Sequence, residues 1–279
     1  MKIIDTHLHL WDIKELRYSW LDSVPAISAT HGVSEIQKET KNIDIEKFVF
    51  VQCGCDDGLE LQEVKWVVKQ AEIENRISGI VAAARLEEGE GVEDYLETLK
   101  TFSLVKGVRR LIQSEKDGFC IQPDFVKGVQ SLMKYNFSFD ICVYQHQLKD
   151  VIQLVDQCPG VQFVLDHIGK PLIGKGEIEP WGDHLKKLAS YKNVQCKMSG
   201  LVTEADVMNW NVEQLKPYIQ KVVEVFGEDR IMYGGDWPVV KLACSYENWF
   251  KTIYQELVPL GESALVKIFK TNAETFYRL

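Results

Sequence analysis

The chain has 279 residues, 46% of them apolar, and its net charge of −9 is spread along the sequence without a basic block. That length and composition suffice to bury a large core, whereas the charge argues against nucleic acid and anionic membranes as partners. No apolar run reaches the roughly 18 residues of a membrane-spanning helix. The N-terminus lacks the features of a signal peptide, and seven scattered cysteines suit a reducing compartment, so we expect a cytoplasmic protein.

The first predicted element is a strand over residues 2–9 that ends in two histidines separated by one residue. Residues i and i+2 of a strand project from the same face, so His7 and His9 are expected side by side. Two imidazoles in that position can bind one metal ion or one substrate oxygen. A pair of surface histidines near a terminus is the simpler alternative.

Seven further apolar, β-branched runs follow, separated by amphipathic segments at a spacing of roughly 25–45 residues that suits βα units. The strands are predicted at 48–53, 78–84, 105–111, 138–144, 162–167, 194–199 and 230–235. The helices are predicted at 59–74, 92–102, 124–135, 147–157, 181–190, 212–226 and 246–257. This α/β pattern predicts a (β/α)8 barrel of the TIM type, as a single domain over residues 1–279. A doubly wound open sheet is the alternative, but no Gly-x-Gly-x-x-Gly follows the first strand.

Polar residues stand at the C-terminal ends of several of these strands, where barrel enzymes have their active sites. Asp236 follows two glycines, whose small size is expected to leave room above its carboxylate. A carboxylate that faces His7, His9 and His167 can orient a water molecule and accept its proton. The simpler readings are a helix N-cap for Asp236 and a hydrogen-bonded core residue for His167.

Three basic residues on later strands are also candidates. Lys197 is expected to point inward, where it must pair with a charge or with substrate because a lone buried ammonium is costly. Arg109 and Arg110 point to opposite faces, so one enters the barrel and suits forked recognition of a carboxylate or a polarised carbonyl. Strand alternation alone does not decide which one. The other candidates for substrate binding are Gln145, His146, Ser199 and Trp237, with a loop role for His146 and a packing role for Trp237 as alternatives.

Taken together, these residues resemble the amidohydrolase superfamily, in the metal-dependent hydrolase branch that contains fuconolactonase and rhamnonolactonase. The resemblance runs nearly end to end. The segments that carry it are Asp5-Thr6-His7-Leu8-His9-Leu10-Trp11-Asp12, Tyr18-Ser19-Trp20-Leu21, Gly107-Val108-Arg109-Arg110-Leu111, Leu165-Asp166-His167-Ile168-Gly169-Lys170-Pro171, Lys197-Met198-Ser199-Gly200-Leu201 and Tyr233-Gly234-Gly235-Asp236-Trp237-Pro238.

The resemblance implies a hydrolase that opens a sugar-derived lactone to the aldonic acid, with a small-molecule substrate and with the oligomeric state left open. It implies Asp236, His167 and Lys197 as catalytic residues, with Lys197 at the oxyanion or ring oxygen. It also implies His7, His9, His167 and Asp236 as ligands of a metal. Many members bridge two metals with a carboxylated lysine on the fourth strand, but here that strand ends in Arg109 and Arg110. We therefore expect one divalent ion, with zinc as the first choice, or no metal.

Two other functions stay open at this point. Related families hydrolyse dicarboxylate lactones or carry out metal-dependent decarboxylation, although a polyanionic substrate calls for several arginines in the pocket. A catalytically silent binding protein that kept the barrel is the other alternative. The intact set of histidines, Asp236 and Lys197 argues against it.

Overall fold

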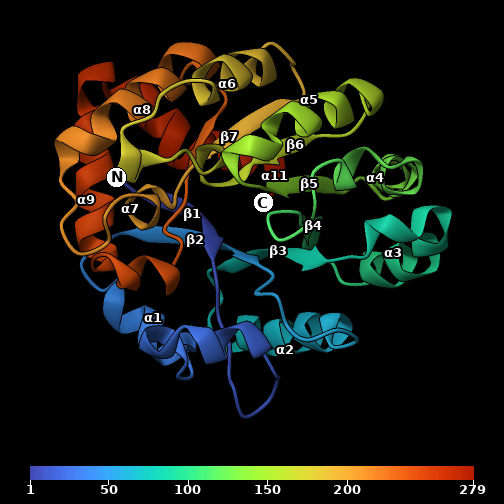
Figure 1. Cartoon of the computed structure of the whole chain (residues 1–279). Coiled ribbons are helices and arrows are strands. Elements are labelled where there is room, and N and C mark those ends of the chain that lie inside the picture. The colour runs from blue at the N-terminus through green and yellow to red at the C-terminus, as the bar shows by residue number, and fades with distance from the viewer.

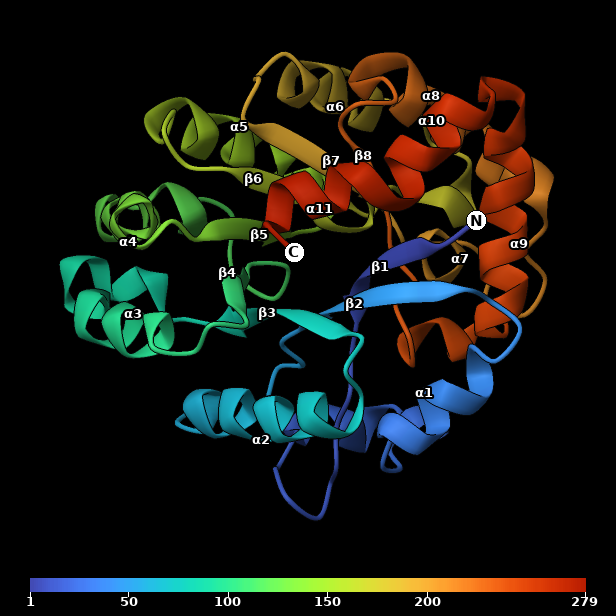
Figure 2. The same cartoon turned by 180° about the vertical axis from the view of Figure 1, so that it is seen from behind.

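The computed structural model describes all 279 residues and confirms the predicted (β/α)8 barrel (Figures 1 and 2). Eight parallel strands follow one another around the sheet in chain order. They are β1 Ile3–Leu8, β2 Ile45–Val51, β3 Ile77–Ala83, β4 Val105–Leu111, β5 Ser138–Cys142, β6 Phe163–Leu165, β7 Val194–Met198 and β8 Ile231–Tyr233. A parallel bridge between Leu8 and Trp237 brings the chain after β8 against β1.

Most helices lie outside the ring of strands (Figure 1). The seven that the periodicity predicts are α2 Glu60–Ile73, α3 Glu93–Lys100, α4 Pro123–Tyr135, α5 Leu148–Gln157, α6 Trp181–Ala189, α8 Val212–Phe226 and α9 Tyr246–Leu257. The sequence analysis missed the short helices α1 Val33–Glu39, α7 Leu201–Glu204, α10 Glu262–Val266 and α11 Asn272–Tyr277. One or two turns are too short to establish a 3.6-residue period. No helix has both the length and the apolar character needed to cross a membrane.

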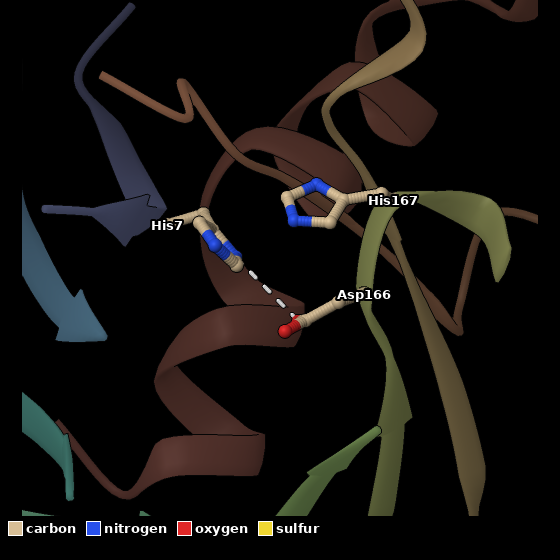
Figure 3. A group of neighbouring side chains, drawn as sticks. All are labelled: His7, Asp166 and His167. Carbon is tan, nitrogen blue, oxygen red and sulfur yellow. Dashed lines mark ion pairs between the residues drawn. The ribbon is translucent and has the colours of Figure 1, made fainter. Parts of the chain in front are cut away.

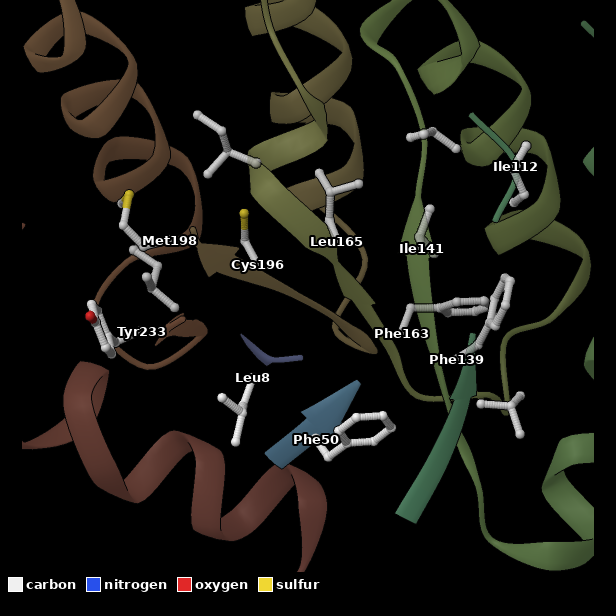
Figure 4. Close-up of a cluster of buried hydrophobic side chains, with 14 of the residues drawn as sticks. Leu8, Phe50, Ile112, Phe139, Ile141, Phe163, Leu165, Cys196, Met198 and Tyr233 are labelled. Carbon is white, nitrogen blue, oxygen red and sulfur yellow. The ribbon is translucent and has the colours of Figure 1, made fainter. Parts of the chain in front are cut away.

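Most of the hydrophobic core lies between the strands and the surrounding helices, in one cluster of 72 buried residues. Side chains alternate along each strand, so Phe139 and Ile141 of β5 point outward and contribute to this cluster. Figure 4 shows them beside Phe163 and Leu165 of β6 and Cys196 of β7. Because the outward side chains pack the strands against the helices, inward-facing positions can carry polar and charged side chains.

The barrel interior has an apolar floor with charged residues above it. The floor is a separate cluster of nine buried residues: Ile4, Val49, Val51, Val81, Val164 and Met232 from the strands, with Ala273, Phe276 and Tyr277 from α11. Figure 2 shows α11 lying across the barrel, with the C-terminus near the middle of the ring. Nearer the C-terminal ends of the strands, the buried side chains are Arg109, Asp140, Asp166 and Lys197. The fold therefore directs its buried charges toward one end.

Candidate active site

Asp5, in β1, fixes the backbone around the first histidine. Its Oδ1 accepts hydrogen bonds from the backbone N–H of His7 (2.9 Å) and of Gly235 (2.7 Å), and its Oδ2 accepts one from the Tyr246 hydroxyl (2.8 Å). Asp5 thus joins β1, the segment after β8 and helix α9. Asp5 had no predicted role, because two of its three partners, Gly235 and Tyr246, lie more than 200 residues away in the chain.

His7 and His9 turn their Nε2 atoms toward each other at 3.1 Å. On the far side of its ring, His9 Nδ1 lies 2.7 Å from the carbonyl oxygen of Val51. A carbonyl only accepts hydrogen bonds, so His9 Nδ1 carries the proton and the neutral ring directs the lone pair of Nε2 at His7. Asp236 Oδ1 completes the group, 3.6 Å from His9 Nε2 and 3.8 Å from His7 Nε2.

This group of donor atoms fits one divalent cation. The three separations of 3.1, 3.6 and 3.8 Å lie near the ~3.3 Å between ligands of a tetrahedral zinc ion with bonds of about 2 Å. Two imidazole nitrogens and one carboxylate oxygen are ordinary zinc ligands, and the Val51 carbonyl orients His9 as an outer-shell partner would. His9 and Asp236 both line a cavity, which leaves a coordination position accessible to substrate or water.

A second group, His7, Asp166 and His167, is less suitable (Figure 3). The rings of His7 and His167 lie 4.4 Å apart between centroids, and Asp166 Oδ1 lies 3.5 Å from His7 Nδ1. However, Asp166 already faces two cations, because its Oδ2 accepts a hydrogen bond from Arg109 at 3.1 Å and its Oδ1 lies 3.0 Å from Lys197 Nζ. A metal ion bound there would have to compete with both cations for the Asp166 carboxylate.

His167 and Lys170 are held by a left-handed turn after β6. His167, Ile168, Gly169 and Lys170 all have positive φ, between 47° and 77°. Three of these residues are not glycine, and such strain is typical of functional sites. His167 Nδ1 lies 3.0 Å from the Ser199 hydroxyl and 3.9 Å from Asp236 Oδ2. Asp236 therefore faces His9 and His7 with one carboxylate oxygen and His167 with the other.

The glycines before Asp236 serve close packing, not open space above its carboxylate as the sequence analysis expected. A Cβ on Gly234 would lie 2.8 Å from His7 Cβ. A Cβ on Gly235 would lie 2.5 Å from Asp5 Oδ2 and 2.2 Å from Tyr246. That expectation was wrong, because the glycines face the first strand and helix α9. They allow the Asp236 backbone to approach β1.

The ionisable groups of the site are strongly shifted by burial. Burial raises the pKa of Asp236 to about 8, although Lys170 and Arg109 act in the opposite direction. Burial lowers the pKa of His9 to about 3, and it lowers the pKa of His7 and His167 well below the usual value, so all three rings are neutral. A cation among these groups would favour the ionised carboxylate.

Arg109 is the arginine that enters the barrel, and Arg110 faces the other way. Arg109 is 4% exposed and donates hydrogen bonds to Asp166 and to the Gln52 carbonyl oxygen. Arg110 instead pairs with Glu87 and Glu115 in the loops outside the barrel. Arg110 borders a neighbouring cavity between these loops, not the cavity that contains Asp236, which corrects its expected place in the substrate site.

Lys197 points inward, but it does not reach the cavity. Its side chain is fully buried, with Nζ 2.6 Å from Asp140 Oδ2 and 3.0 Å from Asp166 Oδ1. Both carboxylates raise its pKa despite burial, which acts to lower it, so the ammonium is charged. The predicted contact with the oxyanion or ring oxygen does not fit this position. Lys197 instead supports the imidazoles from below.

The cavity above Asp236 has a volume of about 360 Å³. Its residues are His9, Trp11, Trp20, Cys53, Gly54, Arg109, Leu111, Gln113, Ser114, Cys142, His167, Lys170, Thr203, Asp236 and Val239. Three expected substrate contacts are absent from this wall. Gln145 accepts a hydrogen bond from the backbone N–H of Leu172, the His146 side chain is 59% exposed, and Trp237 is buried against His31. Ser199 also lies beneath the surface, where it contacts His167.

Comparison with known proteins places these residues in context. Residues 4–279 match the Amidohydrolase family. An uncharacterized protein of Sinorhizobium fredii is 30% identical, over 99% of this chain and 98% of its own length. L-fucono-1,5-lactonase of Burkholderia ambifaria is 26% identical, over 99% and 95% of the two chains. The crystal structure of an amidohydrolase from Burkholderia multivorans with bound zinc is 25% identical, with a TM-score of 0.89 and complete coverage of both chains.

Proposed function

The chain belongs to the amidohydrolase family, and we propose that it is a hydrolase of cyclic esters that opens a sugar-derived lactone to the aldonic acid. The observation that carries the proposal is the Asp236 carboxylate, which lies within 4 Å of His7, His9 and His167 at a cavity wall. The similarity to a fuconolactonase over almost the full length of both chains supports the choice of a lactone.

In the proposed reaction, Asp236 is the general base. Its Oδ2 takes a proton from a water molecule as the water oxygen attacks the lactone carbonyl carbon. The C–O bond to the ring oxygen then breaks, and the leaving alkoxide takes the proton back from Asp236. The products are one hydroxyl and one carboxylic acid, which ionises and releases a proton. His167, beside Asp236 Oδ2, orients the attacking water.

The positive charge for the developing oxyanion comes from Arg109, which lines the cavity and whose guanidinium is fixed by Asp166 and the Gln52 carbonyl oxygen. We propose one divalent ion, with zinc as the first choice because the Burkholderia multivorans protein binds it. The ion would be held by His7, His9 and Asp236 and would polarise the lactone carbonyl; His167, expected from the sequence as a further ligand, lies outside this group and contacts Ser199 instead. A lactone is an activated ester and needs less electrophilic assistance than an amide.

The other cavity residues favour a neutral substrate that carries hydroxyl groups. The cavity has two cationic side chains, and both are already paired: Arg109 with Asp166, and Lys170 with Gln113 Oε1 (2.6 Å) and Glu204 (3.9 Å). A dicarboxylate would need free arginines. Gln113, Ser114 and Thr203 can exchange hydrogen bonds with hydroxyl groups, and Trp11 and Trp20 add aromatic surface to the cavity wall.

The test is a panel of lactones followed by proton release in a pH-stat at equal substrate concentrations. We expect neutral aldonolactones to be opened far faster than lactones with two or three carboxylates. Aldonolactones also open spontaneously. The Asp236→Asn variant, measured in parallel, therefore gives the rate of lactone opening without the proposed base. Preference for a dicarboxylate lactone would replace the sugar assignment, and no activity above that rate on the whole panel would end the lactonase proposal.

A further inference from the structure

Beneath the imidazoles lies a column of buried charges, of which the proposed reaction uses only Arg109 directly. Tyr277 of α11 donates its hydroxyl to Asp140 Oδ2 at 2.7 Å, and Lys197 Nζ donates to the same oxygen at 2.6 Å. Lys197 also lies 3.0 Å from Asp166, which accepts a hydrogen bond from Arg109. Asp140, Asp166, Lys197 and Tyr277 are fully buried. Two cations balance two carboxylates, so the column carries no net charge.

The top of this column meets His7 at Nδ1, where two neighbours compete. Asp166 Oδ1 lies 3.5 Å from this nitrogen and can only accept a proton, whereas Lys197 Nζ lies 3.4 Å from it and can only donate one. Neutral His7 carries a single ring proton. At the other ring nitrogen, Arg109 Nη1 lies 3.3 Å from Nε2 and can only donate, so Arg109 and Asp166 favour the proton on Nδ1 and Lys197 is the neighbour that opposes it.

The two tautomers have opposite consequences for the cavity side. With the proton on Nδ1 and directed at Asp166, His7 presents a bare Nε2 to His9 Nε2 and Asp236, and the group can hold a cation. With the proton on Nε2, Nδ1 accepts from Lys197, and Nε2–H donates to His9 Nε2 across 3.1 Å. That hydrogen bond occupies the position of the cation. Only His7 can change, because the Val51 carbonyl fixes the tautomer of His9.

We propose that Asp140 is a positioning residue that selects the metal-binding tautomer of His7 through Lys197. The shortest contact of the ammonium is the one with Asp140, and the ring of Tyr277 lies on the same side, with its centroid 5.5 Å from Nζ. Both attract Lys197 toward the floor. The Tyr277 hydroxyl fixes the carboxylate to which Lys197 is bound. Asp166 is then the partner of His7 Nδ1–H, and Nε2 carries no proton.

Substitution of Asp140 separates this role from simple packing. In Asp140→Asn, Lys197 loses its closest anion and can turn an N–H toward His7 Nδ1, so the Nε2–H tautomer should gain population. Zinc affinity should then fall by about 10–100-fold, the usual effect of losing an outer-shell partner. In the double variant Asp140→Asn/Lys197→Met the competing donor is gone as well. The Nδ1–H tautomer and most of the zinc affinity should therefore return.

The experiment reads the ring nitrogens of His7 directly. Protein labelled with ¹⁵N-histidine is freed of metal by chelation, and two-bond ¹H–¹⁵N correlation spectra distinguish protonated from bare nitrogens; a His7→Asn variant assigns the signals. Zinc affinity is measured separately by competition with a chromophoric chelator. Tyr218→Phe is the control for stability, because it removes a buried hydroxyl that donates to the Glu177 carbonyl oxygen, away from the site. It should change neither readout.

We expect Nδ1–H in the wild type, a shift toward Nε2–H in Asp140→Asn, and reversal in the double variant. A wild-type protein that carries the proton on Nε2 would overturn the proposal, even if Asp140→Asn failed to fold. So would an Asp140→Asn protein with unchanged spectra, or a double variant no better than the single one. The proposal rests on the metal site of the proposed function, but the tautomer is measured without substrate, so absence of lactonase activity leaves this test intact.

Discussion

The backbone N–H of Asp236 donates a hydrogen bond to the carbonyl oxygen of His7 at 2.8 Å, and Asp236 Oδ1 lies 3.8 Å from His7 Nε2. These two residues are 229 positions apart in the chain, and they meet where the segment after β8 lies against β1. The contact that closes the barrel is therefore also the contact that assembles the site. Substitutions that disrupt this contact between β1 and the segment after β8 are expected to reduce stability and activity together.

Asp236→Asn is the substitution that tests the base. Asparagine keeps the size of the side chain and the backbone hydrogen bond to His7, but it cannot take a proton from water. We expect turnover to fall by at least about 100-fold, in line with general-base contributions, with an unchanged circular dichroism spectrum. Asp117→Asn, which changes an exposed carboxylate paired with His146, should retain full activity. A folded Asp236→Asn enzyme with normal turnover would refute the assignment.

Metal content should be no more than one divalent ion per chain. The fourth strand contributes Arg109 to the interior in place of a bridging lysine, and its Nη1 lies 3.1 Å from Asp166 Oδ2, so a second cation in the group of His7, Asp166 and His167 would be repelled. Elemental analysis of protein purified without chelator measures this ratio. His9→Asn should lose the ion, whereas His146→Asn, which changes an exposed side chain outside the cavity, should keep it. Two ions per chain would indicate instead a centre in which one ligand bridges two metals. Full activity after exhaustive chelation would show that catalysis needs no metal.

Gly200→Ala should displace His167. Gly200 has φ of 68°, and a Cβ there would lie 2.5 Å from His167 Nδ1. Gly176 is the matched control, because it has φ of 69° with nothing within 4 Å of its Cβ position. Both substitutions carry the strain of a left-handed alanine, about 1–2 kcal/mol. Only Gly200→Ala should also reduce turnover, by about 10-fold or more, as measured by steady-state kinetics beside thermal melting. Equal kinetics in the two variants would contradict the proposed role of His167.

Glu63 provides a test of stability against pH. This residue of α2 is fully buried; its Oε1 accepts from the Cys53 backbone N–H at 3.1 Å, while Oε2 has no partner. Burial raises the pKa of Glu63 from 4.5 to about 7. Between these values the unfolded chain ionises and the folded protein does not, so the residue progressively lowers stability as pH rises from 4.5 to 7.

Glu63→Gln removes this penalty, and a glutamine oxygen can still accept from Cys53. Relative to wild type, the variant should therefore gain free energy of unfolding across that pH range, by up to about 3 kcal/mol above pH 7. Urea denaturation of both proteins at pH 5 and pH 8 measures the gain. A stability difference that is the same at both pH values would show that Glu63 is not protonated in the fold.

The strands and most helices were predictable because each has its own hydrophobic period. The convergence of His7, His9, His167 and Asp236 was predictable for a related reason, since the C-terminal ends of parallel strands must meet at one end of a barrel. Side-chain alternation also predicted that Lys197 points inward and needs a partner. It did not identify Asp140, which lies in the middle of β5 and gives no signal at a strand end.

The cavity wall was much harder to predict. Gln113 and Lys170 lie on loops after β4 and β6, and Thr203 lies in the short helix α7 after β7; the course of these segments depends on packing between distant parts of the chain. Gln145 and His146 seemed equally suitable in the sequence because they follow β5 directly, but the short turn Gln145–Gln147 carries them outside the cavity. The sequence also did not indicate how far each inward-facing side chain lies from the cavity. Lys197 faces the right way, yet it ends one layer below the cavity.

The closing of the barrel floor by α11 bears on how the protein is made. The floor residues Ala273, Phe276 and Tyr277 follow all eight strands in the chain. A nascent chain that already contains all eight strands still has an interior open to water from below, with Asp140 and Lys197 hydrated and not sealed. Docking of α11, and not the pairing of the last strand, is therefore the step expected to exclude this water.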